Sequence, residues 1–186
     1  DSMALALLSR LIKEEKNKKI YFVHVDHAIR KNSGKEALRL KKILKKNKIN
    51  LKIIKNKKNI KKNIQKNARD RRYEILCHFC MKNNIKSLVT AHHKDDQIET
   101  FLIRLSRGSG VEGLSSMSET SKLNNGIKLL RPFLKFRKKE LQIISNKFFS
   151  KIIKDPSNKD KKFLRTNIRE LTKILKNKGI DPDQIY

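Results

Sequence analysis

Short apolar segments alternate with longer helical segments through the first half of the chain. The apolar segments run from Ile20 to Val25, from Leu51 to Ile54 and from Ser87 to Thr90, and helical patterns fill Ser33 to Lys46 and Asn63 to Lys82. Strands that alternate with helices form parallel β–α–β units whose helices cover the faces of a sheet. The chain is therefore predicted to be an α/β protein with a Rossmann-like parallel sheet and flanking helices.

Polar residues follow directly after two of these predicted strands. Asp26 and His27 follow the first strand, and the segment from Thr90 to His93 ends the third. In open α/β sheets, ligands bind outside the carboxyl ends of the strands. Because both clusters lie at this edge, we expect them to contribute to one ligand site.

The run from Thr90 to Leu114 combines histidines, carboxylates and a glycine-rich turn. If a helix starts after the histidines, His92, Asp96 and Glu99 share one of its faces. Such a face suits Mg²⁺ bound to nucleotide phosphates, because Mg²⁺ takes one or two protein carboxylates and keeps most of its water and phosphate ligands. The alternative is structural, since acidic residues in a first helical turn cap the helix and complement its dipole.

The chain begins with Asp1 and Ser2, followed by an apolar helical segment. This pair resembles the end of the SGGxDS loop of N-type ATP pyrophosphatases, whose backbone amides hold the pyrophosphate of ATP at a helix N-terminus. The glycines of that loop are absent from the sequence, so we expect an N-terminally truncated fragment. The resemblance implies an adenine nucleotide alpha hydrolase-like fold without its first strand and most of its phosphate loop.

Within that superfamily, the chain resembles the tRNA(Ile)-lysidine synthase family. Five segments carry the resemblance, and they occur in the family's order over almost the whole chain. They are VDHAIR (25–30), NIQKNARDRRYEIL (63–76), the run 90–114, RPFL (131–134) and DPSNKDKKFLRTNIR (155–169). Each segment alone is weakly specific, whereas the combination is very specific.

The resemblance implies a ligase that acts on the wobble cytidine of an isoleucine tRNA with a CAU anticodon. In this family, ATP adenylates the C2 carbonyl of the base with release of diphosphate, and the amine of free L-lysine then displaces AMP to give lysidine. ATP and Mg²⁺ are the implied cofactors.

The resemblance also implies which residues contact ATP. Asp1 and Ser2 match the phosphate loop, and Asp26 and His27 match positions beside the nucleotide. Adenylation needs the phosphates held by backbone amides and a metal while charge builds on the leaving diphosphate.

Five further positions match the family's catalytic residues: Arg72, His92, Asp96, Glu99 and Arg165. By this resemblance, Asp96 and Glu99 hold Mg²⁺ or receive the lysine ammonium. The two arginines are expected to stabilise phosphate charge. Without the motifs, ordinary solvated side chains would be the better interpretation of both arginines in so basic a chain.

The domain organisation is expected to be a catalytic domain at residues 1–134 and a helical extension of the same core at residues 135–186. Helices are predicted from Lys135 to Phe149 and from Leu164 to Lys178. The polar segment from Ser115 to Gly126 is expected to be a mobile linker.

The composition is compatible with a tRNA partner. The chain has 47 basic and 18 acidic residues, a net charge of +29, and such a surface releases counterions on binding RNA. The excess is Lys accompanied by Asn and Ile, whose codons are A/T-rich, so genome bias also contributes. No apolar run reaches the length that spans a membrane. Two cysteines imply no disulfide framework, which favours a cytoplasmic location, and the oligomeric state stays open.

Two other functions stay open. A tRNA thiolase also adenylates a base carbonyl but delivers sulfur, and Cys77 and Cys80 are the one feature that favours it. A catalytically inactive, basic RNA-binding domain is the second alternative. The segment from Gly108 to Gly113 fits the pattern GxGxxG, but it follows a predicted helix instead of a strand, so no dinucleotide site is expected there.

Overall fold

The computed structural model describes residues 1–58, 60, 62–115, 117–149, 164–181 and 184. The helices are α1 (Ser2–Glu15), α2 (Ser33–Lys46), α3 (Ile64–Lys82), α4 (Lys94–Leu105), α5 (Val111–Leu114), α6 (Lys138–Phe148) and α7 (Leu164–Asn177), with a 3₁₀ turn η1 (Asn124–Gly126). The strands are β1 (Phe22–Asp26), β2 (Leu51–Lys55), β3 (Ser87–Val89), β4 (Thr120–Lys122) and β5 (Lys128–Leu130). Residues 155–163 of the DPSNKDKKFLRTNIR segment lie outside the described residues.

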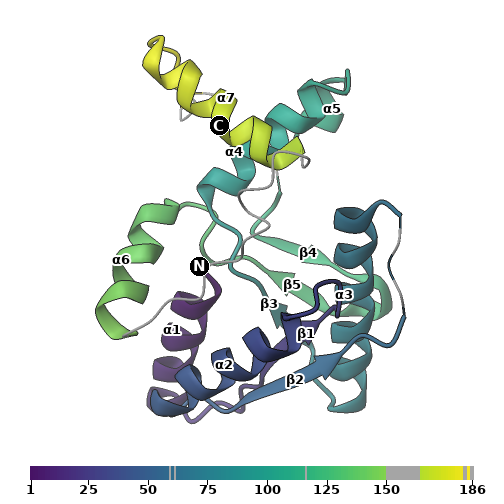
Figure 1. Ribbon diagram of the computed structural model, residues 1–186, viewed down its shortest axis with the longest axis vertical. Coiled ribbons are helices and arrows are strands. Elements are labelled where there is room, and N and C mark those ends of the chain that lie inside the picture. The colour runs from purple at the N-terminus through teal and green to yellow at the C-terminus, as the bar shows by residue number, and fades with distance from the viewer. Residues whose placement is uncertain (59, 61, 116, 150–163, 182–183, 185–186) are drawn as a thin grey trace.

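The expected alternation of strands and helices is confirmed (Figure 1). β1 pairs with β2 in parallel, with Phe22 opposite Leu51, and β3 pairs with β5 in parallel. Within the described residues these hydrogen bonds form two sheets, β1–β2 and β3–β5–β4. α3 packs against both β1 and β3 and so connects the two sheets.

The segment expected to be a mobile linker contains secondary structure. β4 pairs antiparallel with β5, and η1 joins them. Asn125 and Gly126 take the left-handed φ values of 71° and 75° that a tight reversal needs, and Gly tolerates this conformation without strain. The backbone N–H of Leu123 donates to the carbonyl of Ile127 at 2.8 Å. β4 (TSK) has no apolar residue and β5 (KLL) is too short to show alternation, so no sequence pattern revealed this pair.

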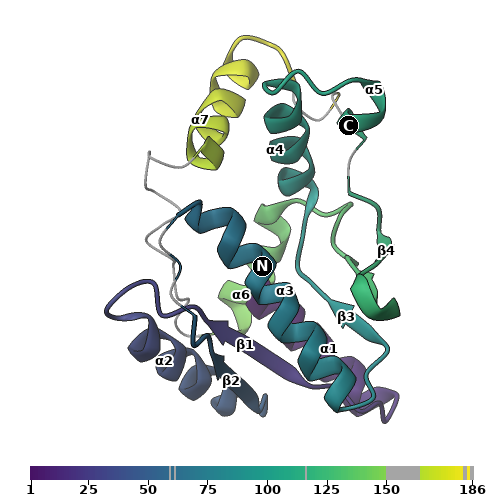
Figure 2. The same cartoon turned by 90° about the vertical axis from the view of Figure 1, so that its right-hand side faces the viewer.

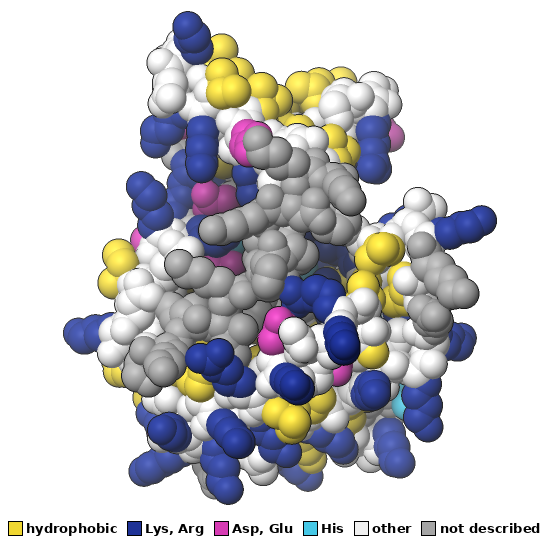
Figure 3. Space-filling model, viewed as in Figure 1, with side chains coloured by type: hydrophobic (Ala, Val, Ile, Leu, Met, Phe, Trp, Pro, Cys, Tyr) yellow, Lys and Arg dark blue, Asp and Glu magenta, His cyan; other side chains and the backbone are white. Residues whose placement is uncertain are grey.

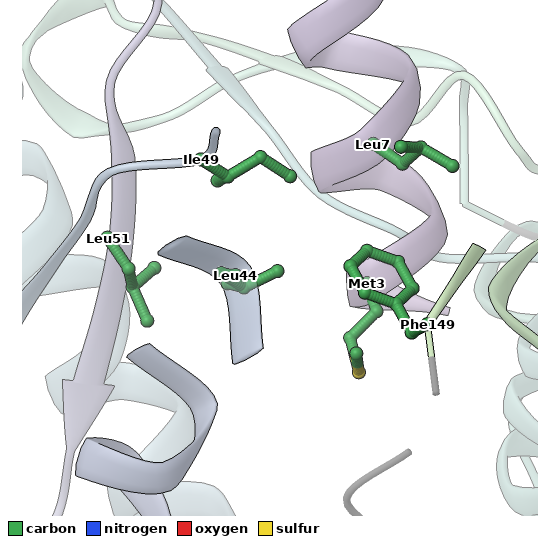
Figure 4. Close-up of a cluster of buried hydrophobic side chains, with 6 residues drawn as sticks. All are labelled: Met3, Leu7, Leu44, Ile49, Leu51 and Phe149. Carbon is green, nitrogen blue, oxygen red and sulfur yellow. The ribbon is translucent and has the colours of Figure 1, made fainter. Parts of the chain in front are cut away.

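The largest described hydrophobic cluster packs α1 against β2 and the end of α2. Its buried members are Met3, Leu7, Leu44, Ile49, Leu51 and Phe149 (Figure 4). Phe149 directly follows α6, so the helical extension shares the core of the first 134 residues. A second cluster of Ala4, Phe133 and Leu141 also joins α1 to α6. α1 is therefore held between α2, β2 and α6 by apolar contacts.

α4 begins beside the sheet and extends away from it, with α7 packed along its side (Figures 1 and 2). Ile98 and Leu102 of α4 and Ile168 of α7 form their own buried cluster. In the part of the chain that the structure describes, no helix combines the length and apolar composition needed to cross a membrane.

Candidate active site

The carboxylate of Asp26 is buried at the carboxyl end of β1. Its Oδ1 accepts a hydrogen bond from the backbone N–H of Ala28 at 2.9 Å, and Ala28 has a left-handed φ of 54°. Burial alone would raise the pKa of Asp26, but hydrogen bonds from Ala28 and Ser33 outweigh burial and lower the pKa. Asp26 is therefore an anion that fixes a strained turn at the carboxyl end of β1.

His27 lies on the same turn with its ring half-buried. Its Nδ1 is buried and has no hydrogen-bond partner among the described residues. Desolvation lowers the pKa of His27, and the positive charge of Arg72 lowers it further. Since buried polar atoms nearly always have partners, a neutral imidazole nitrogen left in this state suits a ligand contact.

His93 caps the start of α4. The backbone N–H of Asp96 donates to His93 Nδ1 at 3.4 Å, and the backbone N–H of His93 donates to Asp96 Oδ2 at 3.1 Å. The opposite ring nitrogen, Nε2, lies 3.3 Å from Asp1 Oδ2. The buried His93 ring thus joins the start of α1 to the start of α4. His92 was among the predicted site residues, whereas this role of His93 was not predicted.

Asp95 and Asp96 cap different helices. Asp95 Oδ2 accepts the backbone N–H of Lys138, the first residue of α6, at 2.9 Å. Asp96 completes the capping box of α4 through one oxygen, while its other oxygen makes no hydrogen bond to the described residues. The structural interpretation therefore accounts for Asp95, whereas Asp96 keeps an oxygen that can face a ligand.

His92 precedes α4 and faces the positive side of the site. Its Nδ1 lies 2.9 Å from the hydroxyl oxygen of Thr90. Desolvation lowers the pKa of His92 to about 4, and three nearby arginines oppose the attraction of Asp96. His92 is therefore neutral at pH 7 and can offer a ring nitrogen, but not a positive charge.

Three arginines contribute positive charge around His92, namely Arg69, Arg72 and Arg131, and a fourth, Arg165, acts on Arg72. Arg69 lies over the ring of Tyr73, with its guanidinium carbon 5.3 Å from the ring centre. Desolvation, Arg69 and Arg165 all lower the pKa of Arg72. More than a third of the surface of Arg72 stays exposed, so solvent screens this repulsion and the guanidinium stays protonated. Uncompensated guanidinium groups in one place suit a phosphate.

Arg131, from the RPFL segment, is 8% exposed. One terminal nitrogen donates to the carbonyl of Ser118 at 2.7 Å and to the hydroxyl of Ser121 at 3.1 Å. Its Nε is buried and has no partner among the described residues. Arg131 was not among the predicted site residues, because a motif in the sequence does not reveal which way its side chain points.

Glu99 forms an ion pair that the sequence analysis did not anticipate. Arg169 of α7 donates from Nε to Glu99 Oε1 at 2.5 Å and from a terminal nitrogen to Oε2 at 3.2 Å. Glu99 is 4% exposed, and bidentate pairs of this kind are strong. Both carboxylate oxygens of Glu99 are therefore bound by a cation of the protein.

Asp1 and Ser2 lie at the start of α1, as expected. Asp1 is the residue before the helix, and its carbonyl accepts the backbone N–H of Leu5 at 3.0 Å. Its Oδ1 is buried without a partner among the described residues, and Ser2 is exposed. The backbone amides of a first helical turn have no intrahelical partners and can bind an anion such as a phosphate.

Mg²⁺ fits some of these carboxylates better than others. Among the described residues, no three His, Cys, Asp or Glu side chains gather as a complete metal site. An ion carried by nucleotide phosphates needs only one or two carboxylates. Asp1 keeps a buried oxygen without a partner among the described residues, Asp96 uses Oδ2 for its capping bond, and both carboxylates lie within 3.5 Å of His93 Nε2. Glu99 fits less well, because Arg169 already binds both of its oxygens.

The GxGxxG-like segment and the pair of cysteines both have structural roles. The segment from Gly108 to Gly113 follows α4 and leads into α5, a helix of four residues. Cys77 and Cys80 are free, buried side chains of α3 that pack with Ile127. Burial raises the pKa of both thiols, so neither is a reactive thiolate.

Comparison with protein families identifies the class of protein to which this fold and site belong. The model of the PP-loop domain, an ATP-binding family, matches residues 1–175. The chain therefore belongs to the PP-loop domain family.

Within this class the chain is similar to enzymes named tRNA(Ile)-lysidine synthase. It is 43% identical to that of Wolbachia pipientis wMel over 100% of this chain and 43% of the relative. It is 41% identical to that of the Wolbachia of Brugia malayi over 87% of this chain and 38% of the relative. It is 39% identical to that of Streptococcus pyogenes serotype M1 over 91% of this chain and 37% of the relative. The chain thus spans about two fifths of the length of these curated relatives.

A solved structure shows the same fold. A U34-tRNA thiolase from Methanococcus maripaludis, solved with its 4Fe–4S cluster, aligns with a TM-score of 0.72 over 98% of this chain and 66% of that chain. At 16% sequence identity this likeness establishes the fold alone.

Proposed function

We propose that this chain is part of a cytoplasmic tRNA(Ile)-lysidine synthase, which attaches L-lysine to C2 of the wobble cytidine in an isoleucine tRNA with a CAU anticodon. The observation that carries the proposal is the 43% identity to the Wolbachia enzyme over the whole chain. The products are the lysidine-containing tRNA, AMP and diphosphate. Residues 1–134 would supply the nucleotide site, and residues 135–186 would extend it.

The proposed nucleotide site lies between the starts of α1 and α4. Backbone amides at Ser2 and beyond would bind the phosphates, while Asp26 and His27 would contact the nucleoside. The buried, unpartnered Nδ1 of His27 supports this role. Asp1 and Asp96 would hold Mg²⁺, whose charge would offset that of the diphosphate as it leaves.

The proposed reaction needs positive charge where phosphate charge builds. Arg72 and Arg165 lie near each other without a carboxylate partner among the described residues, so they are suited to that charge. Neutral His92 would offer a hydrogen bond to the base or phosphate.

The basic surface supports binding of tRNA. On the face shown in Figure 3, Lys and Arg side chains are spread widely instead of forming one patch. Such a distribution favours backbone contacts over base recognition. Specificity for one tRNA would then depend on residues at the active site.

The thiolase alternative has less support. The likeness to the Methanococcus thiolase is confined to the fold, and Cys77 and Cys80 are buried with raised thiol pKa values. A reactive sulfur carrier needs an accessible thiolate.

The test is ATP-dependent incorporation of labelled lysine into isoleucine tRNA with a CAU anticodon by the complete protein. Asp96→Asn keeps an oxygen that can accept the capping hydrogen bond but removes the charge, so incorporation should fall by about a hundredfold or more. Asp95→Asn makes the same chemical change at a residue that caps α6 and should retain most activity. Absence of lysine incorporation by the unmodified protein, with sulfur transfer in its place, would establish the thiolase function.

A further inference from the structure

In the part of the chain that the structure describes, α7 has its main contacts with α4. Ile168 of α7, 5% exposed, packs against Ile98 and Leu102 of α4. Both views show α7 alongside α4 and away from the sheet (Figures 1 and 2). Small apolar contact areas permit sliding and rotation, so a directional contact is needed to fix how α7 is turned about its axis.

The Glu99–Arg169 ion pair supplies that directional contact. It has two hydrogen bonds in a fork geometry, at 2.5 Å and 3.2 Å, and the carboxylate is buried. A planar guanidinium on a planar carboxylate restricts rotation of both side chains. Replacing Arg169 removes this contact from the buried Glu99 carboxylate, which is costly.

Fixing Arg169 also fixes Arg165. The two residues are four positions apart on α7, so they lie on the same face of the helix. Arg165 is close enough to Arg72 for its charge to lower the pKa of Arg72. The ion pair at Arg169 therefore turns α7 so that Arg165 reaches the arginines near His92.

We propose that Glu99 is a positioning residue: through Arg169 it holds α7 so that Arg165 and Arg72 together receive a phosphate group of the substrate. This inference rests on the proposed function for the identity of the reaction. It gives Glu99 a task other than binding Mg²⁺, and that difference can be measured.

The first experiment compares Glu99→Gln with Arg169→Gln in the complete protein. Because both variants break the same contact, each should lower kcat for lysine incorporation by about a hundredfold, while the Mg²⁺ concentration for half-maximal rate stays unchanged. The double variant Glu99→Gln/Arg169→Gln should be no worse than either single variant. Lys173→Gln removes an exposed positive charge one turn further along α7 and serves as the matched control.

A different response of the two single variants to Mg²⁺ would overturn the proposal. If Glu99→Gln raises the Mg²⁺ requirement several-fold and Arg169→Gln does not change it, Glu99 is a metal ligand. Wild-type activity of Arg169→Gln would overturn the proposal equally.

A second measurement does not depend on the reaction. Hydrogen exchange of the α7 amides should become faster in Glu99→Gln and Arg169→Gln and should stay at the wild-type rate in Lys173→Gln. The charge-swapped variant Glu99→Arg/Arg169→Glu should restore part of the protection. Unchanged exchange in both single variants would refute the positioning role even if the protein proved to catalyse a different reaction. Absence of lysine incorporation by the unmodified protein would refute the proposed function alone.

Discussion

His93 Nε2 lies 3.3 Å from Asp1 Oδ2, while Nδ1 of the same ring accepts the backbone N–H of Asp96. One buried imidazole thus connects the helix that would bind phosphates to the helix that carries the candidate catalytic carboxylate. The arrangement needs a neutral ring with its proton on Nε2, because a protonated Nδ1 cannot accept a hydrogen bond. Protonation of His93 would therefore break the N-cap hydrogen bond of α4 at Nδ1, while Nε2 would keep its contact with Asp1.

The stability of the protein should fall as the pH drops below about 6.5. Burial lowers the pKa of His24, His27, His92 and His93, and that of His92 reaches about 4. In this range the unfolded chain binds more protons than the folded chain, so the free energy of unfolding decreases as the pH falls from about 6.5 towards 4. His92 alone would contribute up to about 3 kcal/mol, less the part that solvent screens.

Urea denaturation at several pH values between 4 and 7.5 measures this dependence. His92→Gln removes one titrating group and should flatten the curve. A free energy of unfolding that stays constant over the interval, or increases as the pH falls, would contradict the burial of these histidines.

Replacement of His93 should separate its two contacts. Asn is a good N-cap residue, so the amide oxygen introduced by His93→Asn can accept the Asp96 N–H, but the shorter side chain cannot reach Asp1. His93→Asn should lose about 1 kcal/mol of stability and raise KM for ATP, whereas His93→Ala should lose about 2 kcal/mol or more because a cap and a buried ring both disappear. Thermal unfolding and ATP titration check the two effects, and equal stability of both variants would contradict the capping role.

The side chain of Gln97 should hold the backbone of Met117, in the segment that follows α5. Its side chain is 0% exposed, donates to the carbonyl of Met117 at 2.6 Å and accepts the backbone N–H of Met117 at 2.7 Å. Gln97→Leu removes both hydrogen bonds and leaves the two backbone groups of Met117 unpaired, at a cost of about 2–4 kcal/mol. Hydrogen exchange around Met117 should become faster than in wild type. Unchanged exchange there would mean that other contacts hold the segment.

Long patterns in the sequence predicted the fold well. The helices from Ser33 to Lys46 and from Leu164 onwards carry repeated apolar positions, and the structure has helices α2 and α7 at these places. β4 and β5 were not predicted, because their pairing depends on contacts across a turn. The periodicity of apolar residues predicts single helices and strands but does not predict which strands pair.

The locations of several predicted site residues agree with the sequence analysis, whereas their contacts were not predicted. Asp96, His92 and Asp26 lie at the expected edge, yet the sequence could not show that Arg169 would bind Glu99 or that His93 would cap α4. The first contact joins residues 70 positions apart, and the second requires the rotation of one side chain. Both follow from tertiary packing, which spacing along the chain does not encode.

Removing both cysteines should leave lysine incorporation intact. Cys77 and Cys80 are 7% and 3% exposed and fill space beside Ile127. Cys77→Ala/Cys80→Ala should lower the free energy of unfolding by about 1 kcal/mol for each residue, through lost packing, and should keep kcat within about twofold because neither thiol touches the candidate site. In the unmodified protein, burial and the raised thiol pKa should make alkylation by iodoacetamide slow until urea unfolds the chain. Fast alkylation of the folded protein, or loss of tRNA modification in the double alanine variant, would place the thiols in the chemistry. Because buried thiols of raised pKa cannot supply a thiolate at neutral pH, we expect the cysteines to be part of the core and lysine, not sulfur, to be the group transferred.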